Sequence, residues 1–181
     1  MSRNCKFKYP EGMCFVSFAT VFWIDVFVSK SYFDCIVKNL SHCIENKGME
    51  IYAWCVMTSH VHLVYKSVVQ KPEDLLRDFK TFTSKKMIKL IEENSQESRR
   101  EWLLNAFAKA GKKNGNNSKN QFWQQHNKPI ELWSNDVIDQ KINYIHYNPV
   151  VAGFVENECE YLYSSAKDYA GNKGLIKIVS A

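Results

Sequence analysis

The stretch that decides the fold is residues 51–66, IYAWCVMTSHVHLVYK, a largely apolar run that contains His60 and His62. Along an extended strand, successive side chains point to opposite faces, so residues two apart lie side by side on one face. Both imidazoles would therefore be presented to one point in space. Imidazole is the commonest metal ligand in proteins, and this pair needs only one or two further donors to form an open divalent-metal site.

The residues around the pair favour a site over a surface position. Two histidines at this spacing would also fit a half-buried surface, with one hydrogen bond each. However, Met57, Val61 and Leu63 are apolar, and a polar group buried in such a run without a partner costs roughly 1 to 3 kcal/mol. Thr58 and Ser59 indicate a tight turn, so the histidines would begin the strand that follows it.

Length and composition predict one domain spanning residues 1–181. The net charge of +5 favours an anionic partner such as nucleic acid, although a mild surplus of this kind is common. The six cysteines include no C-x-x-C pair and are interpreted as reduced core thiols. The apolar residues 13–28 are too few for a spanning helix and contain Asp25, which favours a buried strand. We therefore expect a soluble, cytoplasmic protein with no membrane partner.

The first half of the chain predicts a strand, a helix, two strands and a second helix. The first strand is expected within residues 13–21, where the sequence is rich in Phe, Val and Thr. A helix capped by Ser29 or Ser31 should end at Gly48. After the two strands on either side of the turn, Pro72 should open an amphipathic helix that also carries many lysines.

The second half is less regular. A short helix is expected near residues 102–107, followed by a flexible basic loop at 111–120 that has almost no apolar side chain. Residues 128–133 (KPIELW) predict an edge strand, because proline cannot donate to a sheet ladder. The residues from about 166 to 181 are expected to form a C-terminal surface tail.

This order predicts an α+β fold, a ferredoxin-like (split β-α-β) antiparallel sheet with helices on one face. His60 and His62 would lie on a central strand. The other face of the sheet would remain available for a ligand.

Residues 135–148 (NDVIDQKINYIHYN) predict one further helix. Ser134 or Asn135 can cap its start, and Pro149 is expected to stop it. At about 100° per residue, three isoleucines fall in one stripe that should face the core: Ile138, Ile142 and Ile145.

A flank of this helix carries Lys141, Tyr144 and Asn148, roughly a right angle away from the isoleucine stripe. A phenol with an amide oxygen one turn later is the arrangement expected of a nucleophile beside a third metal ligand. The alternative is an amphipathic rim residue and a C-terminal cap. His146 and Tyr147 face other directions and are poorer candidates.

Two motifs carry a resemblance to a known family. AWCVMTSHVHLVY at 53–65 resembles the His-hydrophobic-His strand of the HUH superfamily, in particular the IS200/IS605-like single-tyrosine (Y1) transposases. FW at 122–123, and YIHYNPVVAGFV at 144–155 with YSS after it, resemble the distal motif of the REP-associated tyrosine transposases. The resemblance extends from about residue 14 to residue 165, in family order.

The resemblance implies a role for each motif residue. His60 and His62 would bind Mg²⁺ or Mn²⁺, and Tyr144 would be the nucleophile that cuts DNA and forms a 5′-phosphotyrosine. Asn148 matches the position of a polar third ligand, which is often Gln in the family. Asn is shorter by one methylene group, so this ligand matches the family pattern least well.

The resemblance also implies the partner, which would be single-stranded DNA with hairpins. Relatives of this type are commonly dimers, and some act as monomers. Lys80, Lys85, Lys86 and Lys141 are candidates for contacts with the DNA backbone, and Trp123 for stacking on a base. Each could instead belong to a solvated face or to the core.

Two other functions fit the same residues. A metal-dependent phosphodiester hydrolase would use the histidines without a covalent step. A domesticated hairpin-binding protein would keep the fold and lose strand transfer.

Overall fold

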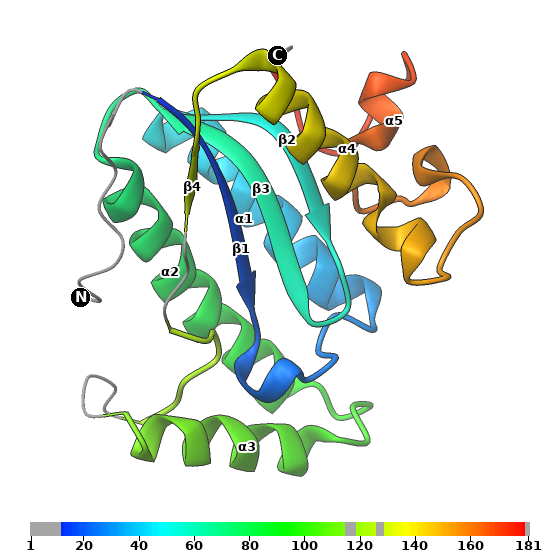
Figure 1. Ribbon diagram of the computed structural model, residues 1–181. Coiled ribbons are helices and arrows are strands. Elements are labelled where there is room, and N and C mark those ends of the chain that lie inside the picture. Colours follow the sequence, from blue (N-terminus) through cyan, green and yellow to red (C-terminus); the bar gives the residue numbers. More distant parts are fainter. Residues whose placement is uncertain (1–11, 115–118, 126–128, 180–181) are drawn as a thin grey trace.

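A computed structural model describes residues 12–114, 119–125 and 129–179. Its four strands form one antiparallel sheet in the order β2-β3-β1-β4 (Figure 1). The strands are β1 (Met13–Ala19), β2 (Met49–Val56), β3 (His60–Ser67) and β4 (Ile130–Leu132). The predicted strands and the central position of the histidine strand are therefore confirmed.

Helices α1 (Lys30–Lys47) and α2 (Pro72–Glu93) cover one face of the sheet (Figure 1). Alternate residues of the strands, such as Val16 and Leu63, are buried in the core beneath them. Gly48 ends α1 as predicted, with φ of 68°. A side chain at this position would also collide with Val69, so glycine is needed there. The short helix predicted near 102–107 is the longer α3 (Arg100–Lys112).

Helix α4 (Asn135–Val151) packs on the opposite face of the sheet, where Ile142 and Ile145 join Phe15 and Cys55 in a second, smaller core. The ferredoxin-like class is thus confirmed, with the two helices of the split unit on one face as predicted. The face that we expected to be open to a ligand is partly covered, because the additional helix lies across it.

Pro149 does not stop α4, which continues to Val151. A proline in the last turn removes one backbone donor only, and the turn after it is closed by other bonds. The amide of Ala152 donates to the carbonyl of Asn148 at 3.0 Å, and that of Gly153 donates to Val150 at 2.9 Å. The predicted start is confirmed, because Ser134 caps the helix by accepting from the amide of Val137.

Residues 163–179 are attached to β2 and to the core, so the described part of the expected tail is held against the fold, although most of its side chains are exposed. The amide of Val56 donates to the carbonyl of Tyr163, and the amide of Ser165 donates to Trp54, both at 2.9 Å. Further on, the side chain of Ile176 is buried in the main core, and the amide of Val179 donates to Ile51 at 2.8 Å. This segment includes the short helices η2 (Glu158–Glu160) and α5 (Ala166–Tyr169).

Other expectations are met in part. The loop predicted at 111–120 begins inside α3, and its centre, 115–118, lies outside the described residues. Four cysteine thiols are buried, Cys159 is exposed, and Cys5 lies outside the described residues. In the described part of the chain, none of the helices combines the length and the apolar character needed to cross a membrane.

A buried polar network ties α4 to the C-terminal segment. The Nε2 atom of His146 lies 2.8 Å from the hydroxyl of Ser165, and the same hydroxyl accepts from the amide of Trp54 at 2.9 Å. Burial lowers the pKa of His146 to about 4, while Glu158 acts weakly in the opposite direction. The imidazole is therefore neutral in the folded protein at neutral pH.

Because this pKa is lower in the folded than in the unfolded chain, protonation favours unfolding. The contribution of a neutral His146 is fully present above about pH 6.5 and declines as the pH falls toward 4, by about 1.4 kcal/mol per pH unit. His146→Gln, which keeps a hydrogen-bonding group near Ser165, should lose this dependence. Urea unfolding at pH 7.5, 6 and 5 should show the stability difference between the two proteins narrowing with acidity; a constant difference would contradict this account.

Candidate active site

His60 and His62 project from β3 toward the face that carries α4, with their ring centroids 4.7 Å apart. His60 is the first residue of the strand, and the amide of Met57 donates to its carbonyl at 2.8 Å across the predicted turn. The hydroxyl of Ser59 lies 3.2 Å from Nδ1 of His60. The alternation along the strand therefore places the two imidazoles side by side, as the sequence predicts.

The His62 side chain is only 3% exposed, yet neither of its ring nitrogens has a hydrogen-bond partner among the described residues. Leaving such a group unsatisfied costs roughly 1 to 3 kcal/mol. Burial, together with the neighbouring His60, lowers the pKa of His62 to about 3. A neutral imidazole with a free lone pair is what a metal ion requires of a histidine ligand.

Helix α4 brings Tyr144 and Asn148 to this pair. The ring of Tyr144 meets the ring of His62 edge to face, with centroids 5.3 Å apart. Burial lowers the pKa of His60, and a hydrogen bond with the side chain of Asn148 acts in the opposite direction. The four residues singled out as nucleophile and metal ligands therefore lie together, although they come from two elements far apart in the sequence.

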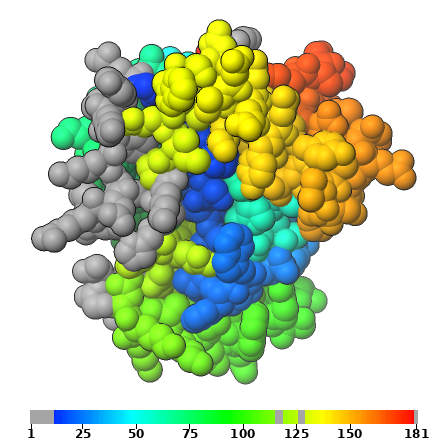
Figure 2. Space-filling model, in the orientation of Figure 1, coloured from blue at the N-terminus to red at the C-terminus, as the bar shows by residue number. Residues whose placement is uncertain are grey.

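Tyr144 remains 49% exposed, so about half of the residue's surface is open to solvent. In the space-filling view, sheet residues in dark blue and cyan are visible between the yellow helix α4 and the blue turn after β1 (Figure 2). Within the candidate site, Tyr144 is thus partly open to solvent while its ring neighbour His62 is buried.

Lys141 lies one turn before Tyr144 on the same flank. Its Nζ atom is 5.1 Å from the ring centroid of Phe15 and 5.8 Å from that of Tyr144. A cation at this distance from an aromatic ring is attracted by the negative face of the ring. Lys141 therefore places a cation beside the ring of the candidate nucleophile.

The other three predicted DNA-binding lysines lie on α2, on the far side of the sheet from α4. Lys85 and Lys86 are exposed there. Lys80 is half-buried, with Nζ donating to the carbonyl of Gln124 at 2.9 Å. The structure does not bring these lysines to the histidine pair.

Trp123 is a correction to the predicted site. Its side chain is only 5% exposed, it packs against Phe18 and Phe27, and its indole nitrogen donates to the hydroxyl of Thr83 at 3.0 Å. No face of the ring is free for a base. The aromatic pair at 122–123 belongs to the core, where its large apolar area is buried.

The donor set fits a divalent cation with open positions. His60 and His62 offer imidazole nitrogens, and Asn148 offers an amide oxygen beside His60. In the described ranges, His, Cys, Asp and Glu side chains do not assemble in threes around a possible metal position. A metal held here would therefore depend on the amide as its third protein ligand and would keep positions for water or substrate.

Sequence reasoning missed two aromatic residues of the site. Phe15 stacks on His62, with centroids 5.8 Å apart and planes inclined by 18°; the alternation of β1 could have placed it on this face. Trp23 lies beside His60, with ring centroids 5.6 Å apart. It follows the end of β1, where no periodic pattern applies.

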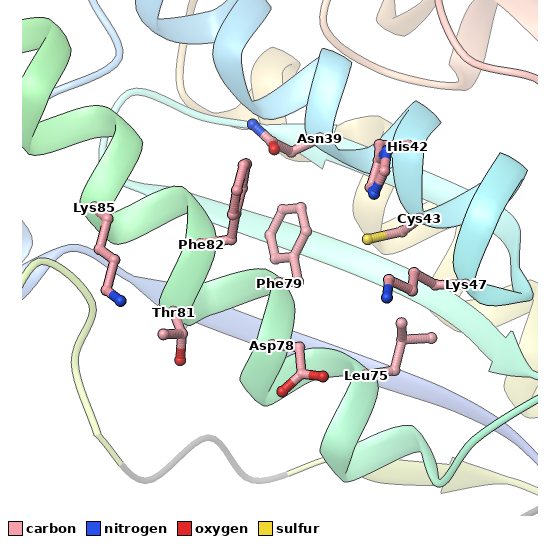
Figure 3. Close-up of a pocket in the computed structure, with 10 residues that line it drawn as sticks. All are labelled: Asn39, His42, Cys43, Lys47, Leu75, Asp78, Phe79, Thr81, Phe82 and Lys85. Carbon is pink, nitrogen blue, oxygen red and sulfur yellow. The ribbon is translucent and has the colours of Figure 1, made fainter.

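A pocket of about 340 Å³ lies between α1 and α2, on the other side of the sheet (Figure 3). Phe79 and Phe82 of α2 face Asn39 and Cys43 of α1 across it. It shares no residue with the histidine site and is not part of it.

Comparison with solved structures identifies the fold. A REP-associated tyrosine transposase bound to a REP hairpin superposes with a TM-score of 0.64 and 15% sequence identity, over 99% of this chain and 93% of that one. A candidate transposase from Deinococcus radiodurans R1 gives a TM-score of 0.45 and 19% identity, over 80% of this chain and 95% of that one. No protein-family model and no curated protein matches the sequence.

The chain therefore has the fold of the REP-associated tyrosine transposase over nearly its whole length. This agrees with the resemblance that the sequence motifs carry.

Proposed function

We propose that this protein is a transposase-like endonuclease and strand transferase that cuts hairpin-containing single-stranded DNA through a 5′-phosphotyrosine. One observation carries the proposal: a half-exposed phenol, Tyr144, lies against a buried histidine whose two ring nitrogens have no partner among the described residues. A candidate nucleophile and an imidazole with an uncommitted lone pair are thus adjacent.

His60, His62 and Asn148 would hold Mg²⁺ or Mn²⁺. When bound, the ion would offset the charge of the phosphodiester and polarise its phosphoryl oxygen. The buried, neutral state of His62 leaves the lone pair of its unprotonated ring nitrogen available for this purpose. The interaction between the His60 ring and the side chain of Asn148, which acts to raise the pKa of His60, supports the amide oxygen as the third ligand.

Tyr144 would supply the nucleophile. Its phenol oxygen attacks the phosphorus while the bond to the 3′ oxygen breaks; the phenol loses its proton, and the departing oxygen takes one up to become a 3′-hydroxyl. An ordinary tyrosine has a pKa near 10, so a nearby cation is needed to favour the phenolate as it forms. Lys141, 5.8 Å from the ring centroid of Tyr144, is placed for this role.

The covalent link would retain the phosphodiester bond energy. A 3′-hydroxyl from another strand can then displace the tyrosine, so strand transfer needs no nucleotide cofactor. The net charge of +5 suits a nucleic-acid partner, and the transposase that shares the fold is bound to a hairpin. These observations support hairpin DNA as the substrate class.

A covalent adduct is the test of this proposal. A labelled hairpin oligonucleotide with single-stranded flanks is incubated with the protein and Mn²⁺ or Mg²⁺, then run on a denaturing gel. We expect a metal-dependent band in which label and protein migrate together. Cleavage without such a band would indicate a hydrolase, and binding without cleavage would indicate a domesticated DNA-binding protein.

Lys85 and Lys86 remain proposed contacts to the DNA backbone, remote from the cutting site. Changing both to Ala should lower the slope of log K against log salt by up to about 2, roughly one for each phosphate that is no longer neutralised. Lys89→Ala is the control on the same helix, because Nζ of Lys89 lies 3.6 Å from Glu93. An unchanged slope in the double variant would remove these two lysines from the interface.

A further inference from the structure

The turn after β1, η1 (Val21–Trp23), presents two aromatic residues in a rarely used conformation. Phe22 and Trp23 have φ of 59° and 56°, the only non-glycine residues with positive φ in the described part of the chain. Bulky side chains avoid this left-handed region because their Cβ atoms crowd the backbone. Surrounding bonds must therefore hold the turn in place.

Thr20 anchors this turn to the histidine strand. Thr20 is fully buried. Its amide donates to the carbonyl of Ser59 at 2.9 Å, and its hydroxyl donates to the backbone carbonyl of Ile24 at 2.7 Å. The amide of Val21 donates to the carbonyl of Phe122 at 2.8 Å. Because Ser59 directly precedes His60, the turn is fixed relative to the candidate metal ligand.

The rings that this strained turn carries are not buried. Phe22 is 54% exposed and Trp23 is 58% exposed, whereas Trp54 and Trp123 lie in the core. The ring of Trp23 meets that of His60 at 69°, with centroids 5.6 Å apart. The turn projects on the opposite side of the uncovered sheet from α4 (Figure 2). An exposed indole thus borders the candidate site across from the helix that carries Tyr144.

We propose that Trp23, with Phe22 beside it, is a stacking platform for an unpaired base next to the phosphate that is cut. The inference rests on the proposed function and specifies which form of DNA the site accepts. A base is one sugar away from its own phosphate, so a ring beside His60 is within reach of the neighbouring base. Stacking on an aromatic ring is tolerant of sequence, because every base has a π-face, and only an unpaired strand offers that face.

Binding of a fluorescein-labelled oligothymidylate tests the platform, with an abasic oligomer of equal length as the second probe. Both are titrated by anisotropy, with Mg²⁺ present. Trp23→Ala should raise the Kd for oligothymidylate by about 5- to 100-fold and leave the Kd for the abasic oligomer nearly unchanged. Trp23→Phe should retain most of the affinity, and Trp23→Leu, which keeps apolar bulk without a π-face, should not.

Trp133→Ala is the matched control, because this tryptophan is 82% exposed and follows β4, whose pairing partners lie in the first half of β1, away from the turn. It should leave both Kd values unchanged. Equal effects of Trp23→Ala and Trp133→Ala, or an equal loss with both probes, would overturn the platform. If Trp23→Ala does not fold, the comparison of Trp23→Phe with Trp23→Leu decides the same question.

The two proposals fail separately. A wild-type adduct on hairpin DNA with no base-dependent effect of Trp23 would leave strand transfer standing and remove the platform. A base-dependent effect without any adduct would leave the platform standing and remove strand transfer.

Discussion

Tyr144→Phe is expected to abolish the protein–DNA adduct and to lower strand cleavage by a factor on the order of 10⁶, the scale measured when an enzyme loses its catalytic nucleophile. The substitution removes one oxygen and leaves the ring. The edge-to-face contacts with His62 and Phe15 can therefore persist. Affinity for hairpin DNA should change less than twofold, measured by anisotropy alongside the denaturing gel.

Tyr147→Phe provides the control on the same helix. Tyr147 is 56% exposed and lies three residues from Tyr144, facing away from the isoleucine stripe. It should form the adduct at the wild-type rate. If Tyr144→Phe still cleaves DNA at a comparable rate in the presence of metal, water rather than the phenol is the nucleophile, and the protein is a hydrolase.

His62→Leu should separate stability from metal binding. Without metal, we expect the free energy of unfolding to rise by about 1 to 3 kcal/mol, because an unsatisfied buried polar group is replaced by an apolar one. Wild-type protein should gain about 2.7 kcal/mol at a Mn²⁺ concentration one hundred times the Kd. The variant should lose this gain, together with cleavage. Urea unfolding with and without Mn²⁺ measures both quantities.

His42→Leu is the control for this experiment. His42 is exposed on α1, on the other face of the sheet, and its Nδ1 atom lies 3.2 Å from the side-chain nitrogen of Asn46, one turn later on the same helix. It should retain the stabilisation by Mn²⁺. A His62→Leu protein that is stabilised by Mn²⁺ as strongly as wild type would show that the metal binds elsewhere.

Local periodicity predicted most of the fold. The two-residue period of β3 placed both imidazoles on one face, and the helical period of α4 placed Tyr144 and Asn148 on one flank. Neither pattern states how far apart the two elements lie. Their convergence follows from the packing of Ile142 and Ile145 on the sheet, which only the folded chain shows.

The errors have a common physical origin. The burial of Trp123 and the attachment of Ile176 and Val179 to the core and to β2 depend on contacts between distant segments, and a local pattern does not encode these. The turn that carries Trp23 was missed for the same reason, since its conformation is imposed by Ser59 and Phe122. The prediction that Pro149 ends the helix was wrong. A proline destabilises a helix less in its last turn, because few backbone hydrogen bonds remain there to be lost.

The bonds from Val56 to Tyr163 and from Ser165 to Trp54 have a consequence for shortened versions of the protein. Without the residues beyond about 160, the outer amides and carbonyls of β2 would lose these hydrogen-bond partners. An unpaired edge strand can pair with other chains and aggregate. The same truncation would remove the hydrogen bond between Ser165 and His146 and weaken the packing of α4 on the sheet. Shortened chains would therefore be expected to lose solubility and the alignment of the phenol with the imidazoles together.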